Sequence, residues 1–391
     1  MNAPASRTYE HCKEWAAQGH EVTVITCVPN FPQGKIYSGY KNRVTQTEQM
    51  DGIRVIRVWS WVAFNRGTLI RILDFLSYAI MAFWRGLFLR TDVIIATSPQ
   101  FFTAVSGYLL SLCKRRPWIF EVRDLWPESI LAVGAIQAKY LIAGLEKVEL
   151  FLYRRAKRIV VVSGSFKSDM VRRSIDPEKI QVIRNGIDIS QVQVSSSSVA
   201  LRARFDIAHT HTVVGYFGTI GMAHGLDFIL RSIEGIDDVT LIIIGEGAAK
   251  RDLIQLKEEL ALQHVIILDA VPKKDIYSYI SMIDVALINL KKSDAFKKVI
   301  PSKIFENAAM QKPILLGLAG EAKSIIEFYQ AGIAFHPEDE QDFKCQISRL
   351  IQNRNLYSIC QVGGQRLAND HDRKKLAHDM LDTIIEAVEE K

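Results

Sequence analysis

The 391-residue sequence predicts an α/β protein made of two doubly wound, Rossmann-like domains. The chain is too long for one ordinary hydrophobic core. Short runs rich in β-branched residues alternate with helical patterns, which is typical of parallel sheets covered by helices. The alternation restarts after a serine run at 195–198, so the pattern occurs twice.

The first half contains six runs expected to form strands, with helical patterns between most of them. The strands are expected at 21–26, 53–59, 92–97, 118–122, 158–163 and 180–184. The Asn185-Gly186 turn follows the last run, and such a dipeptide supports positive φ angles. A joint near 188–200 therefore ends an N-terminal domain at 1–190.

The second half repeats this order. Its strands are expected at 212–217, 239–244, 264–268, 285–288, 312–316 and 332–335, and its helices include 226–234, 250–262, 303–310 and 322–331. A second Rossmann-like domain is thus expected at 191–370, followed by a helix at 371–391. Two such domains facing each other would leave a cleft suited to a ligand.

The start of the chain departs from this plan. A doubly wound domain usually opens with a strand and a glycine-containing turn, but here the chain passes almost directly into a helical segment at 8–18. If 21–26 is the second strand, the first strand is missing and the sheet lacks its usual central member. The domain is therefore expected to have an interrupted sheet.

Composition narrows the class of protein. Residues 1–190 hold 26 Lys and Arg against 16 Asp and Glu, whereas the remainder holds 23 against 27. A basic first half favours an anionic partner such as lipid headgroups, diphosphates or nucleic acid, although an uneven surface is the alternative. The five cysteines are widely spaced without a CxxC pair, which argues against disulfides and zinc and favours a reducing compartment. No signal-peptide pattern opens the chain.

The segment 66–90 has an apolar, aromatic centre at 75–84. Asp74 and Arg85 close this centre after about ten residues, too few to span a bilayer. Cations on both sides, as expected at an anionic surface, are Arg66, Arg71, Arg85 and Arg90. The segment is either a buried helix, an interfacial helix, or both on different faces.

The segment around 298–306 has the features of a loop that enters a helix. Pro301 suits a turn, and Ser302 could cap the first helical turn. A helix N-terminus with nearby cations attracts a diphosphate, and a carboxylate one turn inside could bind ribose hydroxyls. The candidate residues are Lys298, Ile300, Pro301, Ser302, Lys303, Ile304 and Glu306. The alternative is a solvated basic loop before a core helix.

Two glycine turns follow expected strands in the second half. The first contains Gly218, Thr219, Gly221 and His224, and the second contains Gly245 and Glu246. Such turns can cradle phosphate, but plain strand-to-helix geometry also uses glycine.

Charged and aromatic residues also follow the strand at 118–122. They are Arg123, Asp124, Trp126 and Glu128, and ligands of open α/β sheets bind at this strand edge. Arg123 could stabilise a developing negative charge. The alternative is an Arg–Asp salt bridge that holds a loop.

Taken together, these motifs resemble those of GT-B glycosyltransferases of family 4. In that family two glutamates stand eight positions apart before an apolar run; Glu306 matches the second, which binds the nucleotide ribose, while Lys298 stands in place of the first. The family often places Arg and Lys where this chain has Thr219 and His224. The resemblance implies that the turn at 302–304 lies at the donor phosphates.

The first half carries the resemblance further. Many relatives have a His-Asp pair where this chain has Arg123 and Asp124, and the RDLWPES form is similar to a bacterial subgroup of L-fucosamine (FucNAc) transferases of O-antigen and capsule synthesis. The segment at 3–7 resembles a loop that faces donor and acceptor, which makes Arg7 an acceptor-side candidate together with Trp126 and Glu128. A frayed N-terminus is the alternative. In relatives the last helix packs back on the first domain.

The resemblance implies retaining transfer of a sugar, such as an N-acetylated deoxyhexosamine, to a lipid-linked saccharide. It implies a nucleoside diphosphate sugar as donor, UDP being favoured over GDP, with no cofactor and no metal. The enzyme would be cytoplasmic and peripherally bound to an anionic inner-membrane surface. Nucleic acid is not expected as a partner, since no recognised motif accompanies the basic residues. Other readings are a GT-B enzyme such as a nucleotide-sugar 2-epimerase, or a truncated non-catalytic GT-B protein.

Overall fold

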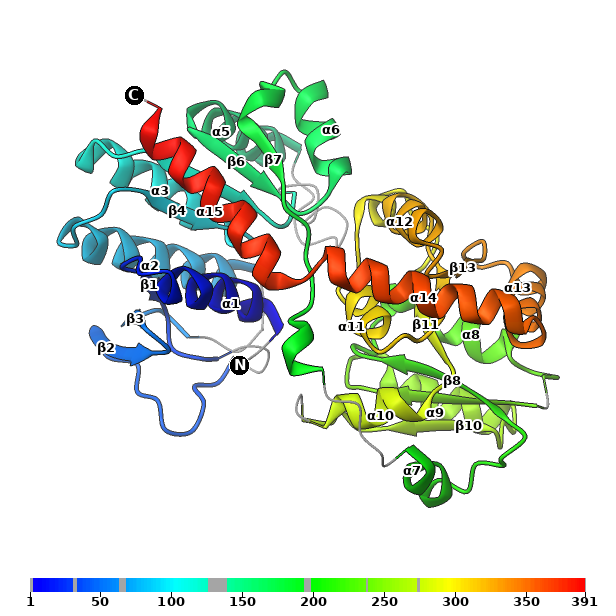
Figure 1. Ribbon diagram of the computed structural model, residues 1–391. Coiled ribbons are helices and arrows are strands. Elements are labelled where there is room, and N and C mark those ends of the chain that lie inside the picture. The colour runs from blue at the N-terminus through cyan, green and yellow to red at the C-terminus, as the bar shows by residue number, and fades with distance from the viewer. Residues whose placement is uncertain are drawn as a thin grey trace. The chain divides into compact units, whose positions relative to one another are not determined.

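The computed structural model describes residues 3–30, 34–62, 68–125, 139–192, 198–236, 238–272 and 275–390. The chain forms two compact units (Figure 1). Unit 1 contains Met1–Arg184 and Arg373–Lys391, and unit 2 contains Asn185–Asp372. The last helix, α15 (Arg373–Glu389), therefore belongs to the unit in which the chain begins.

Unit 1 holds two separate sheets. The order of strands is β1-β3-β2 in one and β4-β5-β6-β7 in the other, and every pairing except β2–β3 is parallel. The strands are β1 (Thr23–Thr26), β2 (Thr45–Met50), β3 (Ile53–Val58), β4 (Ile94–Thr97), β5 (Trp118–Val122), β6 (Arg158–Val161) and β7 (Ile180–Val182). Strand β2 was not predicted from the sequence, because its residues TQTEQM are almost all polar. It is held by antiparallel pairing to β3.

Helices cover both faces of these sheets. Along β5, Trp118, Phe120 and Val122 pack into one hydrophobic cluster, while Ile119 points into another that also contains residues of α1 and α15. This alternation is the two-residue period of a strand buried on both faces. The remaining helices of the unit are α1 (Ala3–Ala17), α2 (Thr68–Leu87), α3 (Phe101–Lys114), α5 (Lys139–Arg155), α6 (Gly164–Arg172) and the 3₁₀ turn η1 (Pro177–Lys179).

Strand pairing does not join the two sheets in the described part of unit 1, as the sequence predicts, and we call this break between β1 and β4 the opening. Among the described residues, β1 pairs only with β3 and β4 pairs only with β5, so each has one edge without a neighbouring strand. All four residues of β1 and three of the four in β4 are only half-buried, whereas β5 is buried throughout.

Unit 2 has one continuous, fully parallel sheet. Its strand order is β10-β9-β8-β11-β12-β13, with β8 paired on both edges. Strands were predicted in all six places, and they are β8 (Thr212–Phe217), β9 (Val239–Ile244), β10 (Val265–Leu268), β11 (Val285–Asn289), β12 (Ile314–Gly317) and β13 (Gly332–Ala334). Two large clusters of buried apolar side chains include residues of this sheet, on β8 and β9 among others.

The helices of unit 2 follow the predicted alternation. They are η2 (Ile189–Gln191), α7 (Ser198–Arg204), η3 (Met222–His224), α8 (Leu226–Ser232), α9 (Lys250–Glu259), α10 (Ile276–Met282), η4 (Ala295–Lys298), α11 (Lys303–Ala309), α12 (Glu321–Tyr329), α13 (Glu340–Gln352) and α14 (Arg354–Asp370).

Candidate donor and acceptor sites

Two glycine turns meet at the carboxyl end of β8 and β9. The backbone N–H of Gly218 donates to the carbonyl of Ile244 at 2.8 Å. A Cβ atom on Gly245 would lie 1.7 Å from the Gly218 carbonyl oxygen, which is closer than any side chain allows. Gly218 itself has a φ of +143°, a conformation that favours glycine. Close backbone approach therefore favours glycine at 245, and the positive φ favours glycine at 218.

The side chain of Lys303, from the start of α11, lies in the space that Gly218 leaves. A Cβ atom on Gly218 would stand 1.9 Å from Lys303 Nζ. The same ammonium lies 5.3 Å from the ring centre of Tyr216. The Tyr216 hydroxyl donates to the Thr219 carbonyl at 2.7 Å, which fixes the ring beneath the turn. The fold thus brings a cation from a distant helix to the glycine turn that follows β8.

The Lys303 ammonium is half-buried, and its surroundings make the charged form less favourable. Burial lowers its pKa, and only the Glu306 carboxylate, one turn along α11, opposes that shift. In the part of the chain that the structure describes, Lys303 Nζ makes no hydrogen bond and no ion pair. By contrast, Lys250 is 2.7 Å from the Glu246 carboxylate. A half-buried ammonium without a carboxylate partner is suited to bind an anion.

His224 lies beside this cation. Asn289 donates to the His224 carbonyl at 2.8 Å, and a Cβ atom on Gly221 would lie 3.4 Å from the imidazole Nδ1. Burial, followed by the charge of Lys303, lowers the pKa of His224, so the neutral imidazole is favoured. Its Nδ1 atom is buried and has no hydrogen-bond partner among the described residues. A neutral imidazole has one nitrogen that donates and one that accepts, so in this position it can form a hydrogen bond of either kind with a ligand.

The turn before α11 differs from the sequence-based expectation. Ser302 has helical backbone angles (φ −59°, ψ −25°) and its side chain makes no capping hydrogen bond, so the predicted cap is wrong. The N–H of Ile304 donates to the Pro301 carbonyl and that of Phe305 to the Ser302 carbonyl, both at 3.1 Å. These two amides are therefore used inside the turn and are not offered to a ligand.

The other predicted donor residues lie around this turn or pack away from it. Ile304 is fully buried and Ile300 packs on the hydrophobic core, so only their backbones can face a ligand. Lys298, in η4, and Glu306 are half-buried. Glu246 is held by Lys250. The nucleotide-binding roles assigned to these residues stay predictions.

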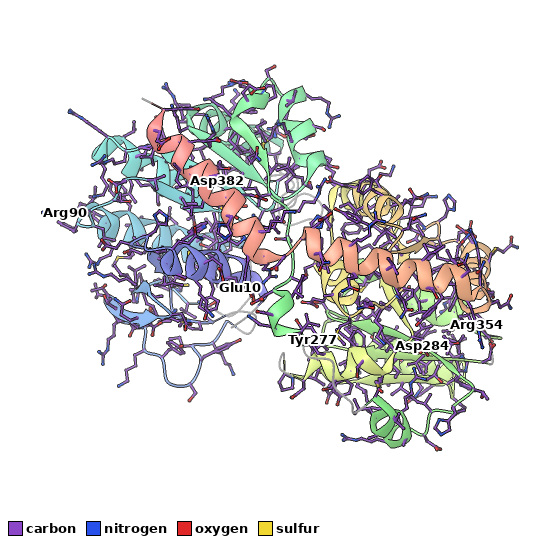
Figure 2. The ribbon with its side chains drawn as sticks, viewed as in Figure 1. Glu10, Arg90, Tyr277, Asp284, Arg354 and Asp382 are labelled. Carbon is purple, nitrogen blue, oxygen red and sulfur yellow. The ribbon has the colours of Figure 1, made fainter. Side chains whose placement is uncertain are left out.

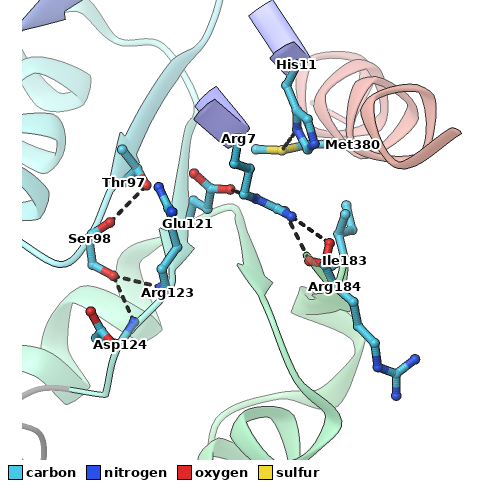
Figure 3. Close-up of polar contacts among 10 residues, drawn as sticks. All are labelled: Arg7, His11, Thr97, Ser98, Glu121, Arg123, Asp124, Ile183, Arg184 and Met380. Carbon is cyan, nitrogen blue, oxygen red and sulfur yellow. Dashed lines mark hydrogen bonds and ion pairs between the residues drawn. The ribbon is translucent and has the colours of Figure 1, made fainter. Parts of the chain in front are cut away.

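In unit 1, the backbone after β5 is fixed by a buried serine (Figure 3). Ser98 Oγ accepts hydrogen bonds from the N–H groups of Arg123 at 2.7 Å and Asp124 at 3.2 Å. Burial raises the pKa of the Asp124 carboxyl, and the neighbouring Arg123 guanidinium opposes that shift. The predicted pair thus lies at the carboxyl edge of the sheet, held by its backbone. Trp126 and Glu128 lie outside the described residues.

Arg7 is engaged inside unit 1. Its guanidinium is 2.8 Å from the Glu121 carboxylate and donates to the carbonyls of Arg184 at 2.6 Å and Ile183 at 3.0 Å (Figure 3). Burial raises the pKa of Glu121, but Arg7 and Arg123 outweigh it and lower the pKa to about 2. These contacts give Arg7 a structural role inside unit 1. Its acceptor-side role stays a prediction. Sequence reasoning missed Glu121, although a glutamate inside an apolar strand is a signal for a buried partner.

Two further properties bear on the chemistry. Across the described ranges, no group of three or more His, Cys, Asp and Glu side chains is arranged to hold a metal ion. None of the helices within those ranges combines the length and the apolar character needed to span a bilayer.

Comparison with known families matches both units. Residues 2–186 match the glycosyl transferase 4-like domain, and residues 199–366 match the glycosyl transferases group 1 domain. The glycosyl transferase WcaI of Escherichia coli (strain K12), named for colanic acid biosynthesis, is 26% identical over 305 residues, which cover 74% of each chain. An N-acetylgalactosamine-N,N'-diacetylbacillosaminyl-diphospho-undecaprenol 4-alpha-N-acetylgalactosaminyltransferase of Campylobacter jejuni is 31% identical over 120 residues, 30% of this chain and 31% of that protein.

Solved structures show the same fold. Sucrose-phosphate synthase from Thermosynechococcus elongatus superposes with a TM-score of 0.77 at 14% identity, covering 98% of this chain and 93% of that chain. Anabaena Alr3699/HepE in complex with UDP gives a TM-score of 0.67 at 18% identity, covering 85% and 86%. With a glycosyl transferase 4-like domain followed by a group 1 domain on the GT-B fold, this chain is a glycosyltransferase.

Proposed function

We propose that this glycosyltransferase moves a sugar from a UDP-sugar to a lipid-linked saccharide in bacterial surface polysaccharide synthesis. The observation that carries the donor half of this proposal is the Lys303 ammonium at the Gly218 turn, which has no hydrogen-bond or ion-pair partner among the described residues. It supplies a cation close to the turn where Thr219 and His224 replace the basic residues common in the family. The diphosphate binds against Lys303 and His224, with the ribose at Glu306.

The chemistry follows from the charge that develops at the donor. When the glycosidic bond to the diphosphate breaks, negative charge grows on the leaving oxygen. A cation already in place stabilises that charge without reorganisation. We assign retention of the anomeric configuration to this reaction, with no metal and no cofactor, and we assign Arg123 and Asp124 to the acceptor side.

The acceptor half rests on the relatives. The Campylobacter enzyme is named for a diphospho-undecaprenol-linked acceptor, and WcaI for colanic acid biosynthesis. An acceptor of this kind lies in the inner membrane, so the enzyme works from its cytoplasmic face. An N-acetylated deoxyhexosamine such as FucNAc is the proposed sugar.

The test measures thermal stability with UDP, GDP and other nucleoside diphosphates, for the wild type, Lys303→Met and Glu306→Ala. We expect UDP to raise the Tm of the wild type and each substitution to abolish most of that rise. Lys323→Met is the matched control, because Lys323 lies on the exposed face of α12 beside Glu327 and leaves the donor turn untouched. No shift with any nucleotide, in a sample that unfolds cooperatively, contradicts the proposal.

An activity assay distinguishes a retaining transferase from a nucleotide-sugar 2-epimerase. With UDP-sugar and a polyprenyl-diphosphate saccharide, we expect a product that carries the donor's anomeric configuration, as read by NMR. Conversion of the UDP-sugar without acceptor, to an epimer or to free UDP and sugar, contradicts the transferase and favours a nucleotide-sugar 2-epimerase.

A further inference from the structure

Among the side chains of α2 that the structure describes, every exposed one is apolar. Among its described side chains, those more than a third exposed are Ile70, Leu73, Leu76, Ile80 and Trp84. They recur every three or four residues and so form one stripe along the helix. Trp84 is 57% exposed, and Phe88, just beyond the helix, is 77% exposed. A helix at the surface of a water-soluble protein normally shows polar residues on this face.

The opposite face of unit 1 shows the normal pattern. Helix α15, on the other side of the sheets, exposes mainly charged or polar side chains, which are Lys374, Lys375, His378, Asp379, Asp382 and Glu386. Asp382 can be followed on this helix in Figure 2. The two helix layers of one domain therefore differ in what they present to the surroundings.

Helix α3, which packs against α2, also exposes apolar side chains. Ser106 Oγ in α3 donates to the Ala79 carbonyl of α2 at 2.8 Å, and Lys114 Nζ donates to the Leu87 carbonyl at 3.0 Å. The first bond joins the middle parts of the two helices, and the second joins their carboxyl ends. On α3 the exposed residues include Leu109 and Leu112. We call the exposed apolar residues of 70–88 on and beside α2, together with Leu109 and Leu112, the α2–α3 face.

Cations gather at the end of this face. Arg90 follows α2 and projects from it, as Figure 2 shows, while Arg115 and Arg116 follow α3; all three are exposed. Arg116 is 3.9 Å from the Asp92 carboxylate, a loose contact between exposed groups. An apolar stripe that ends in arginines matches the chemistry of a bilayer surface, with acyl chains beside anionic phosphates.

We propose that the α2–α3 face docks unit 1 on an anionic lipid bilayer, with the apolar side chains at the acyl boundary and the arginines at the headgroup phosphates. This inference rests on the proposed function, since a lipid-linked acceptor requires an enzyme held at the membrane. The helix of 20 residues is about 30 Å long and lies along the surface. Charge complementarity favours anionic lipid as the occupant, because the exposed Arg90, Arg115 and Arg116 beside the apolar stripe would meet headgroup phosphates.

The test is sedimentation with vesicles of phosphatidylcholine alone and of phosphatidylcholine with 30% phosphatidylglycerol, chosen as the probe. We expect wild-type protein to pellet with the anionic vesicles and only weakly with the neutral ones. Ile80→Ser with Trp84→Ser should reduce binding at least tenfold. Arg90→Glu with Arg115→Glu should remove the preference for anionic lipid.

The matched control is Ile385→Ser with Val388→Ser, which removes two exposed apolar side chains from α15 and should leave vesicle binding unchanged. The UDP-induced Tm shift is measured on every variant. Binding that persists in the α2 variant, or a wild type that does not bind vesicles, overturns the proposal. A concentration-dependent dimer abolished by the α2 substitutions, without lipid binding, overturns it in favour of a second copy. Vesicle binding without a UDP shift instead contradicts the proposed function and leaves the docking face standing.

Discussion

The sheets of the two units are held together by different means. In unit 2, β8 pairs with β9 and β11, so backbone hydrogen bonds run without a break from β10 to β13. In unit 1 no described strand joins β1 to β4. There the two sheets are connected through helices and a few side chains. A central strand is therefore not the only device that can join two halves of a doubly wound domain.

Helix α1 is the main connector in unit 1. It packs on β3 and also on α15, where Trp15 Nε1 donates to the Ala377 carbonyl at 2.8 Å. Arg7 reaches from α1 to Glu121 of β5, in the other sheet. On the opposite face α2 contacts β1 and packs against α3, which contacts β4. The stability of unit 1 should therefore depend on individual side chains, whereas that of unit 2 depends on continuous backbone hydrogen bonding.

All six tryptophans lie at or before position 126, so tryptophan fluorescence reports unit 1, while circular dichroism reports both units. This difference allows each unit to be followed separately in one unfolding experiment.

The largest effect is expected from Arg7→Met. It leaves the Glu121 carboxylate buried without its partner, which typically costs about 3–5 kcal/mol. Fluorescence-detected urea unfolding should shift to lower urea, while the part of the dichroism transition due to unit 2 stays in place. Arg172→Met, which removes an exposed pair with Asp169, is the control and should cost less than about 1 kcal/mol. A small effect of Arg7→Met would show that the helices alone join the sheets.

Glycine-to-alanine substitutions compare how well the continuous sheet of unit 2 and the separate sheets of unit 1 tolerate an added methyl group. In β8, a Cβ on Gly215 would lie 2.6 Å from Ile283 Cγ2, and we expect a cost of up to about 3 kcal/mol because the surrounding sheet cannot move. In α3, a Cβ on Gly107 would lie 2.7 Å from the Cβ of Ala96 in β4. Since β4 has an open edge it can shift, so Gly107→Ala should cost clearly less. Equal losses of stability in the two variants would mean that the unpaired edge of β4 does not allow this strand to shift.

Low pH should destabilise unit 1 through His11, which lies in α1. His11 is buried, with Nδ1 3.4 Å from Met380 Sδ of α15, and faces Arg7, Glu121, Arg123 and Arg373. Burial, followed by the charge of Arg7, lowers its pKa from 6.5 to about 3. The unfolded chain therefore binds the proton more readily, and stability falls as pH drops below 6.5.

Between pH 7.5 and pH 5 this linkage is expected to cost unit 1 about 2 kcal/mol. His11→Gln should flatten that part of the fluorescence-detected stability profile. An unchanged pH slope in the variant would assign the acid sensitivity to other groups.

The smallest effect is expected from filling the opening. Fusing the β8 sequence TVVGYF and a short glycine-serine linker ahead of α1 offers a strand to the free edges of β1 and β4. We expect a gain of about 1 kcal/mol, or several degrees in Tm, since burial is largely offset by the entropy of ordering the segment. The same insert with two prolines is the control, because proline cannot complete the pairing. An equal gain from both inserts would exclude strand pairing as the cause.

Much of the fold could be predicted because it depends on local patterns. Every strand expected from β-branched runs is present, and the described strands of unit 1 form two separate sheets, as the sequence predicts. Strand β2 could not be predicted, since its polar residues gain their conformation from pairing with β3. The Ser302 cap was wrong because backbone angles at the turn are set by packing, which a capping pattern does not reveal.

The sequence by itself determined the two α/β units, the glycine turns and the apolar segment now seen as α2, because these depend on residue type and spacing. Only the tertiary structure decided which charges are paired. It placed the Lys303 ammonium at the Gly218 turn, where no described residue forms a hydrogen bond or ion pair with it, and it paired Arg7 with Glu121, 114 positions away. It also decided that the apolar side of α2 faces outward. The physical reason is that burial and ion pairing depend on contacts between distant segments, which no local pattern contains.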